Sequence, residues 1–356
     1  MYTYALYCIY MEFSFEKIFP VPDMLRMPAI GFDISDTHIR YVELVRKYNG
    51  VHMGRYGTHK IPEGIITEGS IQDVDALASV VGELQKKLDI RLVRASLPEK
   101  KVYLFDVSIP KISENKIPEA ILYQIEEHIP LKKSELVFDY EVLSEDDRTY
   151  HVQIHAIEKN VAMSYTEALS KGGCAPLSFE LEPQAVTRAL ECSQAPHQFM
   201  LVDIGETHTS ISIIRSSIVV FTTTVLLDLL GMTKDIEACV AQFPETNVED
   251  RLSDECVKEM EQYIQPLGEH IKKYYNYWQA HIGSETLGVE KILLSGVGAH
   301  ARGMTEYING LTRLEVMQAP IWSVPNKIGG RMAMSQNELI DYSVAIGLVR
   351  TDFFYD

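Results

Sequence analysis

Two aspartates stand at the ends of apolar strands and could hold a divalent cation. Asp33 lies near the end of the apolar run over residues 29–34, and Asp203 near the end of the run over 199–204. Carboxylate oxygens are preferred ligands of Mg²⁺, which they reach directly or through water. A short bend of small or polar residues follows each aspartate, and the N–H groups of such bends form an anion nest. The pair therefore predicts a phosphate and Mg²⁺ site with Asp33 and Asp203 as metal ligands.

The residues around Asp33 have the pattern of an antiparallel meander. After the bend, residues 39–45 alternate between apolar and polar side chains, as a strand with one buried face does. Residues 48–50 read Tyr-Asn-Gly and predict a hairpin turn, because Asn-Gly tolerates the positive φ of tight turns. Residues 51–60 have the composition of a further strand. We therefore expect three neighbouring strands, with the aspartate at the first bend.

The same order of elements returns in the second half of the chain. Asp203 stands 170 residues after Asp33 and is followed by a bend, a return strand over 209–214 and a third strand over 218–224. Solenoid repeats recur at about 20–50 residues, which is far less than the spacing here. The sequence therefore predicts two homologous lobes whose hairpins face each other.

A third element has the form of a strand, a glycine bend and a helix. The strand covers residues 291–295, the bend reads Ser-Gly-Val-Gly, and the helix is expected over 302–308. Glycine at such a bend lets the backbone approach a ligand closely. The chain has no GxxxxGK[ST] sequence and the bend does not extend to GxGxxG, which disfavours P-loop and dinucleotide-binding sites. We interpret the bend as a third part of the phosphate site.

Composition disfavours several other classes of protein. The formal net charge of −17 argues against nucleic-acid binding, which needs Lys and Arg to neutralise phosphates. The five cysteines form no CxxC pair and the eleven histidines have no ligand spacing, which argues against zinc. The longest uncharged runs, residues 1–11 and 216–227, are shorter than the ~20 residues of a membrane helix. We expect a cytoplasmic protein without direct membrane insertion, with residues 1–27 as an N-terminal extension and Met11 as an alternative start.

Several motifs resemble those of the actin, sugar-kinase and heat-shock chaperone superfamily. Residues 31–36 resemble its first phosphate motif, 203–205 its second, 295–299 its adenosine motif and 345–348 its connecting helix between the lobes. Further motifs follow one another at residues 62–66, 68–73, 95–98, 107–110, 126–130, 138–143 and 180–188. Within this superfamily, the order of these motifs resembles that of the PilM family of type IV pilus assembly proteins.

The resemblance implies an α/β, actin-like (ribonuclease H-like) fold of two lobes. The first lobe would span residues 28–195 and carry a small inserted α+β subdomain at about residues 92–165. The second would span residues 196–350, with a helical subdomain at about 231–285. Within the inserted subdomain we expect two strands, a helix, two strands and a helix. Its first helix, near residues 116–128, has apolar residues four apart, which favours packing on its own sheet.

The resemblance also implies ATP and Mg²⁺ as cofactors in the cleft between the lobes. The cofactor-binding residues that it implies are Asp33, Ser35, Asp36, Thr37, Arg40, Asp203, Gly205, Thr207, Ser295, Gly296, Val297 and Gly298. The chain departs from the family pattern where Ser35 follows the first Asp-Ile in place of glycine, and where Arg40 replaces lysine. The Ala-Glu-x-x-Lys segment that would contact ribose is absent from residues 237–254. These departures predict that nucleotide binds weakly or not at all, and they argue against hydrolysis.

By resemblance, the function is that of a scaffold. In PilM proteins the inserted subdomain takes the N-terminal cytoplasmic peptide of PilN. We therefore expect a PilN-like peptide, pilus motor components and further copies of this chain as partners, at the inner membrane through a protein contact. Two alternatives remain: a small-molecule kinase of the superfamily, which needs a base near the γ-phosphate, and a cell-division scaffold resembling FtsA, which needs a lipid-binding helix. No residue stands out as that base, and the tail over 351–356 is short and acidic.

Overall fold

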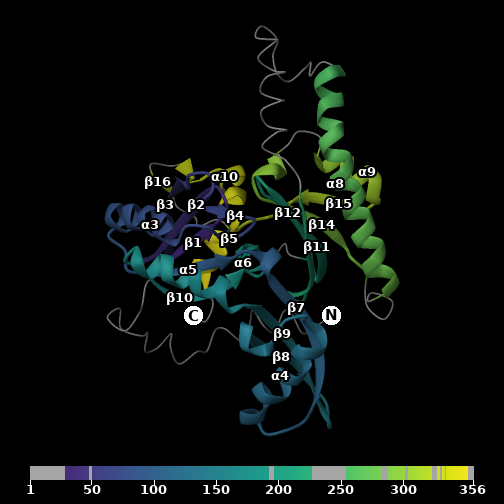
Figure 1. Ribbon diagram of the computed structural model, residues 1–356. Coiled ribbons are helices and arrows are strands. Elements are labelled where there is room, and N and C mark those ends of the chain that lie inside the picture. Colours follow the sequence, from purple (N-terminus) through teal and green to yellow (C-terminus); the bar gives the residue numbers. More distant parts are fainter. Residues whose placement is uncertain are drawn as a thin grey trace.

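Two five-stranded sheets form the centre of the molecule (Figure 1). The computed structural model describes residues 29–47, 50–191, 196–226, 254–281, 288–300, 304–322, 327–328, 331–332 and 334–351. Three expectations lie outside the described residues: the N-terminal extension, the hairpin turn at 48–49 and the first part of the helical subdomain, residues 231–253.

The first sheet has the strand order β10-β6-β1-β2-β3. Its strands are β1 Ile30–Ile34, β2 His38–Lys47, β3 Gly50–Lys60, β6 Leu92–Leu97 and β10 Ala175–Leu181. β1, β2 and β3 form an antiparallel meander, while β6 runs parallel to β1 and β10 parallel to β6. The meander predicted after Asp33 is therefore confirmed.

The second sheet repeats this topology in the order β13-β12-β11-β14-β15. Its strands are β11 Gln198–Ile204, β12 His208–Arg215, β13 Ile218–Leu226, β14 Lys291–Ser295 and β15 Glu315–Gln318. β11, β12 and β13 are antiparallel, and β14 and β15 run parallel to β11. Asp33 pairs with Arg40 where Asp203 pairs with Ser210. The predicted two-lobed, actin-like α/β fold is confirmed.

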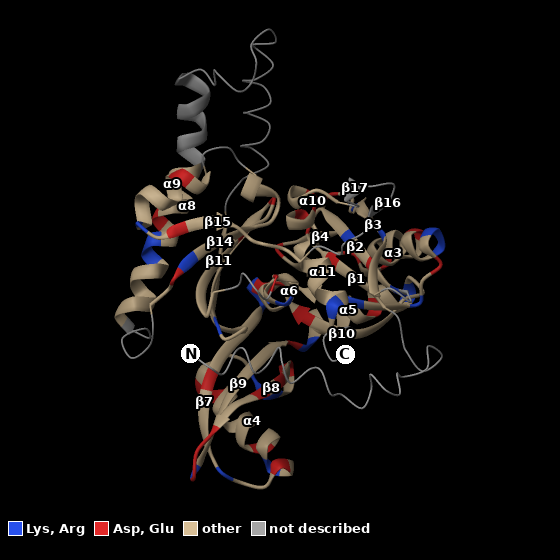
Figure 2. Cartoon of the chain, turned by 180° about the vertical axis from the view of Figure 1, so that it is seen from behind, with Lys and Arg blue, Asp and Glu red and all other residues tan. Residues whose placement is uncertain are grey.

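A smaller three-stranded sheet projects below the two lobes in both views (Figures 1 and 2). It consists of β7 Val102–Pro110, β9 Thr149–Glu158 and β8 Leu136–Glu145, packed with helix α4 Ile117–His128. Ile117, Ile121 and Ile125 of α4 are buried in the core that the helix shares with this sheet. The four-residue spacing of these side chains predicted that packing.

This inserted block is smaller than the sequence indicated. We expected the strand over 92–97 to belong to it, but β6 lies between β1 and β10 in the first sheet. The helix expected at its end, α5 Lys159–Lys171, packs with α3 Val74–Leu88 in the core of the first lobe. Val93 and Ala95 of β6 are fully buried in that core. The expectation was wrong because a local strand pattern does not say which sheet the strand joins.

Helices cover the second sheet as well. The long helix α8 Asp254–His281 and the shorter α9 Met304–Thr312 share a hydrophobic core with it. Trp278 of α8 and Ile308 of α9 are fully buried there. None of the described helices combines the length and the apolar character that a membrane span needs.

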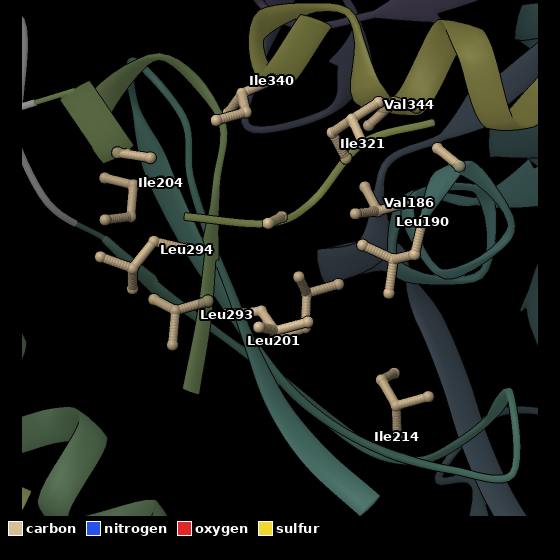
Figure 3. Packing of buried hydrophobic residues seen from close by; sticks show 14 of the residues in the cluster. Val186, Leu190, Leu201, Ile204, Ile214, Leu293, Leu294, Ile321, Ile340 and Val344 are labelled. Carbon is tan, nitrogen blue, oxygen red and sulfur yellow. The ribbon is translucent and has the colours of Figure 1, made fainter. Parts of the chain in front are cut away.

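Two further helices pack against each other between the lobes: α6 Glu182–Ala189 and α11 Ser343–Arg350. α11 contacts β1 so closely that a Cβ atom on Gly31 would lie 2.2 Å from the carbonyl oxygen of Ala345. A Cβ atom on Gly347 would likewise lie 1.7 Å from the carbonyl oxygen of Ala185 in α6. Figure 3 shows Val186 of α6 in the same hydrophobic cluster as the second sheet. The two lobes are thus joined through a continuous core.

The remaining elements are short. Among the described residues, the helix α10 precedes α11, two-residue ladders join β4 to β5 and β16 to β17, and four 3₁₀ turns connect larger elements. Their bounds are α10 Gln336–Asp341, β4 Ile66–Thr67, β5 Ser70–Ile71, β16 Lys327–Ile328, β17 Arg331–Met332, and the 3₁₀ turns Glu99–Lys101, Glu114–Lys116, Lys133–Glu135 and Val297–His300.

Candidate functional site

The bends after β1 and β11 meet in a cleft between the lobes, and the bend after β14 forms its third wall. Nine residues singled out from the sequence line it: Asp33, Ser35, Thr37, Arg40, Asp203, Gly205, Thr207, Gly296 and Val297. The other lining residues are Glu182, Glu206, His208, Asp341, Ser343 and Val344. Local strand and turn patterns therefore located most of the cleft.

The two hairpin bends have nearly the same sequence. Residues 33–38 read Asp-Ile-Ser-Asp-Thr-His and residues 203–208 read Asp-Ile-Gly-Glu-Thr-His. Each bend is closed by the same backbone hydrogen bond, from Ser35 N–H to the carbonyl of His38 (2.9 Å) and from Gly205 N–H to the carbonyl of His208 (3.0 Å). The turn geometry is therefore common to both lobes.

A hydroxyl group distinguishes the first bend from the second. Ser35 Oγ accepts hydrogen bonds from the backbone N–H groups of Thr37 (3.3 Å) and His38 (3.0 Å). Those are donors that a phosphate would need in an anion nest. Gly205 has no side chain that could occupy the equivalent donors. The second bend is therefore the more open of the two nests.

Glu206 extends from the second bend into the first lobe. Its Oε2 accepts a hydrogen bond from Thr37 Oγ1 (2.5 Å) and lies 3.1 Å from His38 Nδ1, while its Oε1 accepts one from Arg40 Nη2 (2.8 Å). The side chains of Arg40 and Glu206 are only 12% and 17% exposed. Burial alone would raise the pKa of Glu206, but the Thr37 hydrogen bond and the Arg40 charge lower it. A largely buried ion pair thus joins the lobes inside the cleft.

Asp33 and Asp203 have pKa values well above that of an ordinary aspartate. The pKa of each is raised to about 7, mainly by burial and also by the nearby carboxylate of Glu182. His208 Nε2 lies 3.8 Å from Glu182 Oε2; burial lowers the pKa of His208, but this contact outweighs it and the net pKa is raised. Crowded carboxylates of this kind favour a bound cation, which relieves their repulsion.

The glycine bend after β14 lies directly against Asp203. Gly296 has a φ of +79°, and a Cβ atom on it would lie 2.4 Å from Asp203 Oδ1, so only glycine fits. Two residues predicted for this wall do not line the cleft. Ser295 is buried and its hydroxyl pairs with Ser343 Oγ at 2.9 Å, and Gly298 is buried within the following 3₁₀ turn. Ser295 and Gly298 are therefore buried next to the residues that line the cleft and do not face it.

Asp36 is the third predicted residue that does not line the cleft. It accepts a hydrogen bond from Gly69 N–H (2.9 Å) and lies 3.6 Å from Lys100 Nζ. Lys100 belongs to the 3₁₀ turn at the base of the inserted block. In the same turn, the buried carboxylate of Glu99 accepts a hydrogen bond from Ser210 Oγ of β12. This turn therefore contacts both hairpins that form the cleft.

Magnesium and ATP can be tested against these residues. In the described part of the chain, no group of three or more His, Cys, Asp or Glu side chains has the arrangement of a metal site. A cation here would need oxygen ligands from phosphate or water in addition to Asp33 and Asp203. The cleft has a cavity volume of about 50 Å³, whereas ligand pockets are typically ~300–1,000 Å³. The donor chemistry suits phosphate and Mg²⁺, but a nucleotide does not fit while Glu206 joins the lobes.

Sequence reasoning missed four ionisable residues that line the cleft, Glu182, Glu206, His208 and Asp341, and also His38, which contacts Glu206. A signal existed for three of them. Alignment of the two halves on Asp33 and Asp203 places His38 beside His208, and Asp36 beside Glu206, within the repeated acid-Thr-His sequence. Glu182 and Asp341 come from helices outside that repeat.

A larger cavity of about 600 Å³ lies between the inserted sheet and the β12–β13 turn of the second lobe. Ser108 and His151 of the inserted sheet line one side, and Arg215, Ile218 and Val220 the other. Gln153 of β9 spans the space beside it, because its Nε2 donates hydrogen bonds to Asp106 Oδ1 (2.9 Å) and to the carbonyl of Val219 (2.8 Å).

Comparisons with solved structures show the same fold. The chain is similar to a protein in the structure of a "PilM-PilN type IV pilus biogenesis complex", with 20% identity, a TM-score of 0.75, and coverage of 92% of this chain and 99% of that one. It is also similar to ethanolamine utilization protein EutJ from Carboxydothermus hydrogenoformans, with 11% identity, a TM-score of 0.50, and coverage of 93% and 90%.

A family model covers most of the sequence. The model described as type IV pilus assembly protein PilM matches residues 31–352, which include both hairpins, the inserted block and α11. Of the three functional classes that the sequence left open, this match supports a type IV pilus assembly protein. The chain belongs to the PilM family of type IV pilus assembly proteins.

Proposed function

We propose that this chain is a cytoplasmic adaptor of type IV pilus assembly that binds the N-terminal peptide of a PilN-like inner-membrane protein. Its place at the membrane would then come from that partner. Pilus motor components and further copies of this chain are the other partners that such an adaptor would have. The family match over residues 31–352 is the main support, because it includes the inserted block that the resemblance links to PilN.

The geometry of the inserted block supports a peptide-binding role. The block has its own hydrophobic core, separate from those of the two lobes. The adjoining cavity of about 600 Å³ offers hydroxyl groups, a guanidinium and apolar side chains, a mixture that suits an extended peptide. The small sheet also ends in edge strands β7 and β8, and an edge strand has backbone groups that a peptide can pair with.

We further propose that ATP with Mg²⁺ is a regulatory ligand of this adaptor. The support is the pair Asp33 and Asp203 at the strand ends, and Gly296, which brings the backbone of the third wall against Asp203. Bound Mg²⁺ would neutralise these carboxylates. Binding would require the lobes to separate, and a ligand that prefers the separated arrangement shifts the population toward it.

Calorimetric titration with the synthetic N-terminal peptide of the PilN-like protein from the same organism tests the adaptor function. We expect saturable binding of one peptide per chain, and no heat from a scrambled peptide of equal charge. No binding to the full chain would contradict the proposal.

Two variants test whether the larger cavity takes the peptide. Ile218→Asp places a charge in the cavity, while Val45→Asp changes an exposed apolar residue of the first sheet that does not line it. Loss of binding in the first variant alone would assign the peptide to the cavity. Equal binding by both would assign it to another face of the chain.

A further inference from the structure

Three first-lobe side chains around Glu206 form an anion-binding group. The hydroxyl of Thr37, the imidazole of His38 and the guanidinium of Arg40 all contact one carboxylate, at 2.5, 3.1 and 2.8 Å. Burial lowers the pKa of Arg40, but the charges of Asp33 and Glu206 outweigh burial and raise it, so the guanidinium stays charged. A hydroxyl together with such a cation is the usual donor set for phosphate oxygens as well.

We propose that Glu206 occupies the position of a phosphoryl group in this first-lobe site, so that Glu206 and a phosphorylated ligand compete for Thr37, His38 and Arg40. The inference rests on the nucleotide part of the proposed function and adds the residue that determines when the cleft can accept the ligand. The ligand class is a phosphoryl chain, such as pyrophosphate or the phosphates of a nucleotide.

The space in the cleft supports competition over simultaneous binding. With Glu206 in place the cavity measures about 50 Å³, which holds a few water molecules but no phosphoryl chain. Glu206 uses both of its carboxylate oxygens on first-lobe donors. A ligand that takes those donors must therefore displace the carboxylate.

Only the second bend supplies a competing carboxylate, although the two bends have nearly the same sequence. Asp36, the residue of the first bend that corresponds to Glu206, is bound within its own lobe to Gly69 N–H and Lys100. Asp36 therefore does not reach the second bend. The backbone donors of that bend also have no hydroxyl partner at Gly205. Release of Glu206 alone would thus expose the second nest, together with the side chains of Thr37, His38 and Arg40, to one ligand.

Titration with sodium pyrophosphate in Mg²⁺ buffer at constant ionic strength tests the proposal in the full chain. We expect Glu206→Ala to bind pyrophosphate roughly 10- to 100-fold more tightly than the unmodified chain, because the competing charged hydrogen bonds are gone. Glu206→Gln keeps the shape and loses the charge, and should fall between the two. Glu315→Gln is the matched control, since Glu315 pairs with Lys291 at 2.9 Å within the second lobe, and its affinity should equal that of the unmodified chain.

Hydrogen exchange without ligand provides a second readout. Residues 35–38 and 205–208 should exchange faster in Glu206→Ala than in Glu315→Gln, because the contact between the lobes is lost. Equal affinities in all variants, pyrophosphate binding to none of them, or unchanged exchange would each overturn the competition. Capture of the PilN-like peptide does not depend on these outcomes, so failure here is distinguishable from failure of the adaptor function.

Discussion

In the first bend Asp36 binds Gly69 and Lys100 of its own lobe, whereas in the second bend Glu206 crosses the cleft to Thr37 and Arg40. Both bends keep the same closing hydrogen bond between the third and sixth residues of the repeat. A duplicated hairpin thus keeps its backbone because local hydrogen bonds define the turn. Its side chains are free to diverge, and here a side chain of the second bend binds side chains of the first lobe.

The largest expected effect comes from the strands that lead into the bends. Two residues before the aspartate, the first strand has Gly31 and the second has Leu201. Gly31→Ala would place a Cβ atom 2.2 Å from the carbonyl oxygen of Ala345, and we expect a loss of about 2–4 kcal/mol in the free energy of unfolding. Leu201→Ala would cost a similar amount, about 2–5 kcal/mol, by leaving a cavity in the fully buried core. Urea denaturation measures both.

Gly310→Ala is the matched control for the glycine substitution. Gly310 lies in α9, and apart from its chain neighbours and the backbone of its own helix, no atom of the described residues is within 4 Å of the position that its Cβ would take. Alanine there should be neutral or stabilise the chain by up to about 1 kcal/mol. If Gly31→Ala did not lower the free energy of unfolding either, β1 and α11 would not lie in this close contact.

The fold could be predicted to a greater extent than the contacts of the site. Strand alternation, Asp33 and Asp203 at strand ends and the glycine bend at Gly296 are local patterns, and they located both hairpins and the third wall. The sheet that β6 joins could not be predicted, because pairing with β1 and β10 depends on tertiary packing.

The same reason explains why Asp36 was predicted in the cleft and Glu206 was missed. A carboxylate next to a phosphate motif has the same local sequence whether it binds its own lobe, as Asp36 does, or the other lobe, as Glu206 does. The contact between Glu206 and Arg40 spans 166 residues of sequence, and no local pattern encodes it. The repeated acid-Thr-His sequence indicates only that the two positions correspond.

The return strands differ at a second pair of corresponding positions, Arg40 and Ser210. Ser210 donates to the buried Glu99, whose other carboxylate oxygen has no hydrogen-bond partner among the described residues. The pKa of Glu99 is raised from 4.5 to about 8, mainly by burial and also by the charge of Glu182, while the Ser210 hydrogen bond opposes the rise only in part. The folded chain thus keeps a proton that the unfolded chain releases, and the free energy of unfolding should fall as pH rises from about 4.5 to 8.

Glu99→Gln should remove the contribution of Glu99 to that pH dependence, while Asp33 and Asp203, whose pKa values are also raised, keep theirs. Near pH 8.5 we expect the variant to be more stable than the unmodified chain by about 1–3 kcal/mol, the range for an unsatisfied buried polar group, with the difference shrinking toward pH 5. His208 and Asp203 also act on Glu99 and remain in the variant. Denaturation midpoints at the two pH values measure the effect, with the exposed Glu114→Gln as control. Parallel pH profiles for Glu99→Gln and Glu114→Gln would contradict the burial of a protonated Glu99.

The two acids of the repeat should differ in their effect on ligand binding. Asp36→Ala removes the partner of Gly69 N–H and should lower the free energy of unfolding by about 1–2 kcal/mol, with little change in pyrophosphate affinity. Glu206→Ala should also lower the free energy of unfolding, because the ion pair with Arg40 is lost, and should in addition tighten pyrophosphate binding. If both variants changed pyrophosphate affinity alike, the two bends would have the same role.

The smallest effect is expected from an exchange at the third position of each bend. Ser35→Gly frees the N–H groups of Thr37 and His38 and should tighten pyrophosphate binding about two- to fivefold in a chain that already carries Glu206→Ala. Gly205→Ser should weaken it by a similar factor. The two variants must change pyrophosphate affinity in opposite directions. A change in the same direction would show that the hydroxyl is not what distinguishes the two nests.

A double-mutant cycle on Arg40 and Glu206 tests most directly whether the second bend holds the first lobe. The free energy of unfolding is measured for the unmodified chain, Arg40→Ala, Glu206→Ala and the double variant. The buried ion pair predicts a coupling free energy of about 1.5–3 kcal/mol. Additive effects, with a coupling below about 0.5 kcal/mol, would show that the two side chains do not interact and that the cleft is not closed by Glu206.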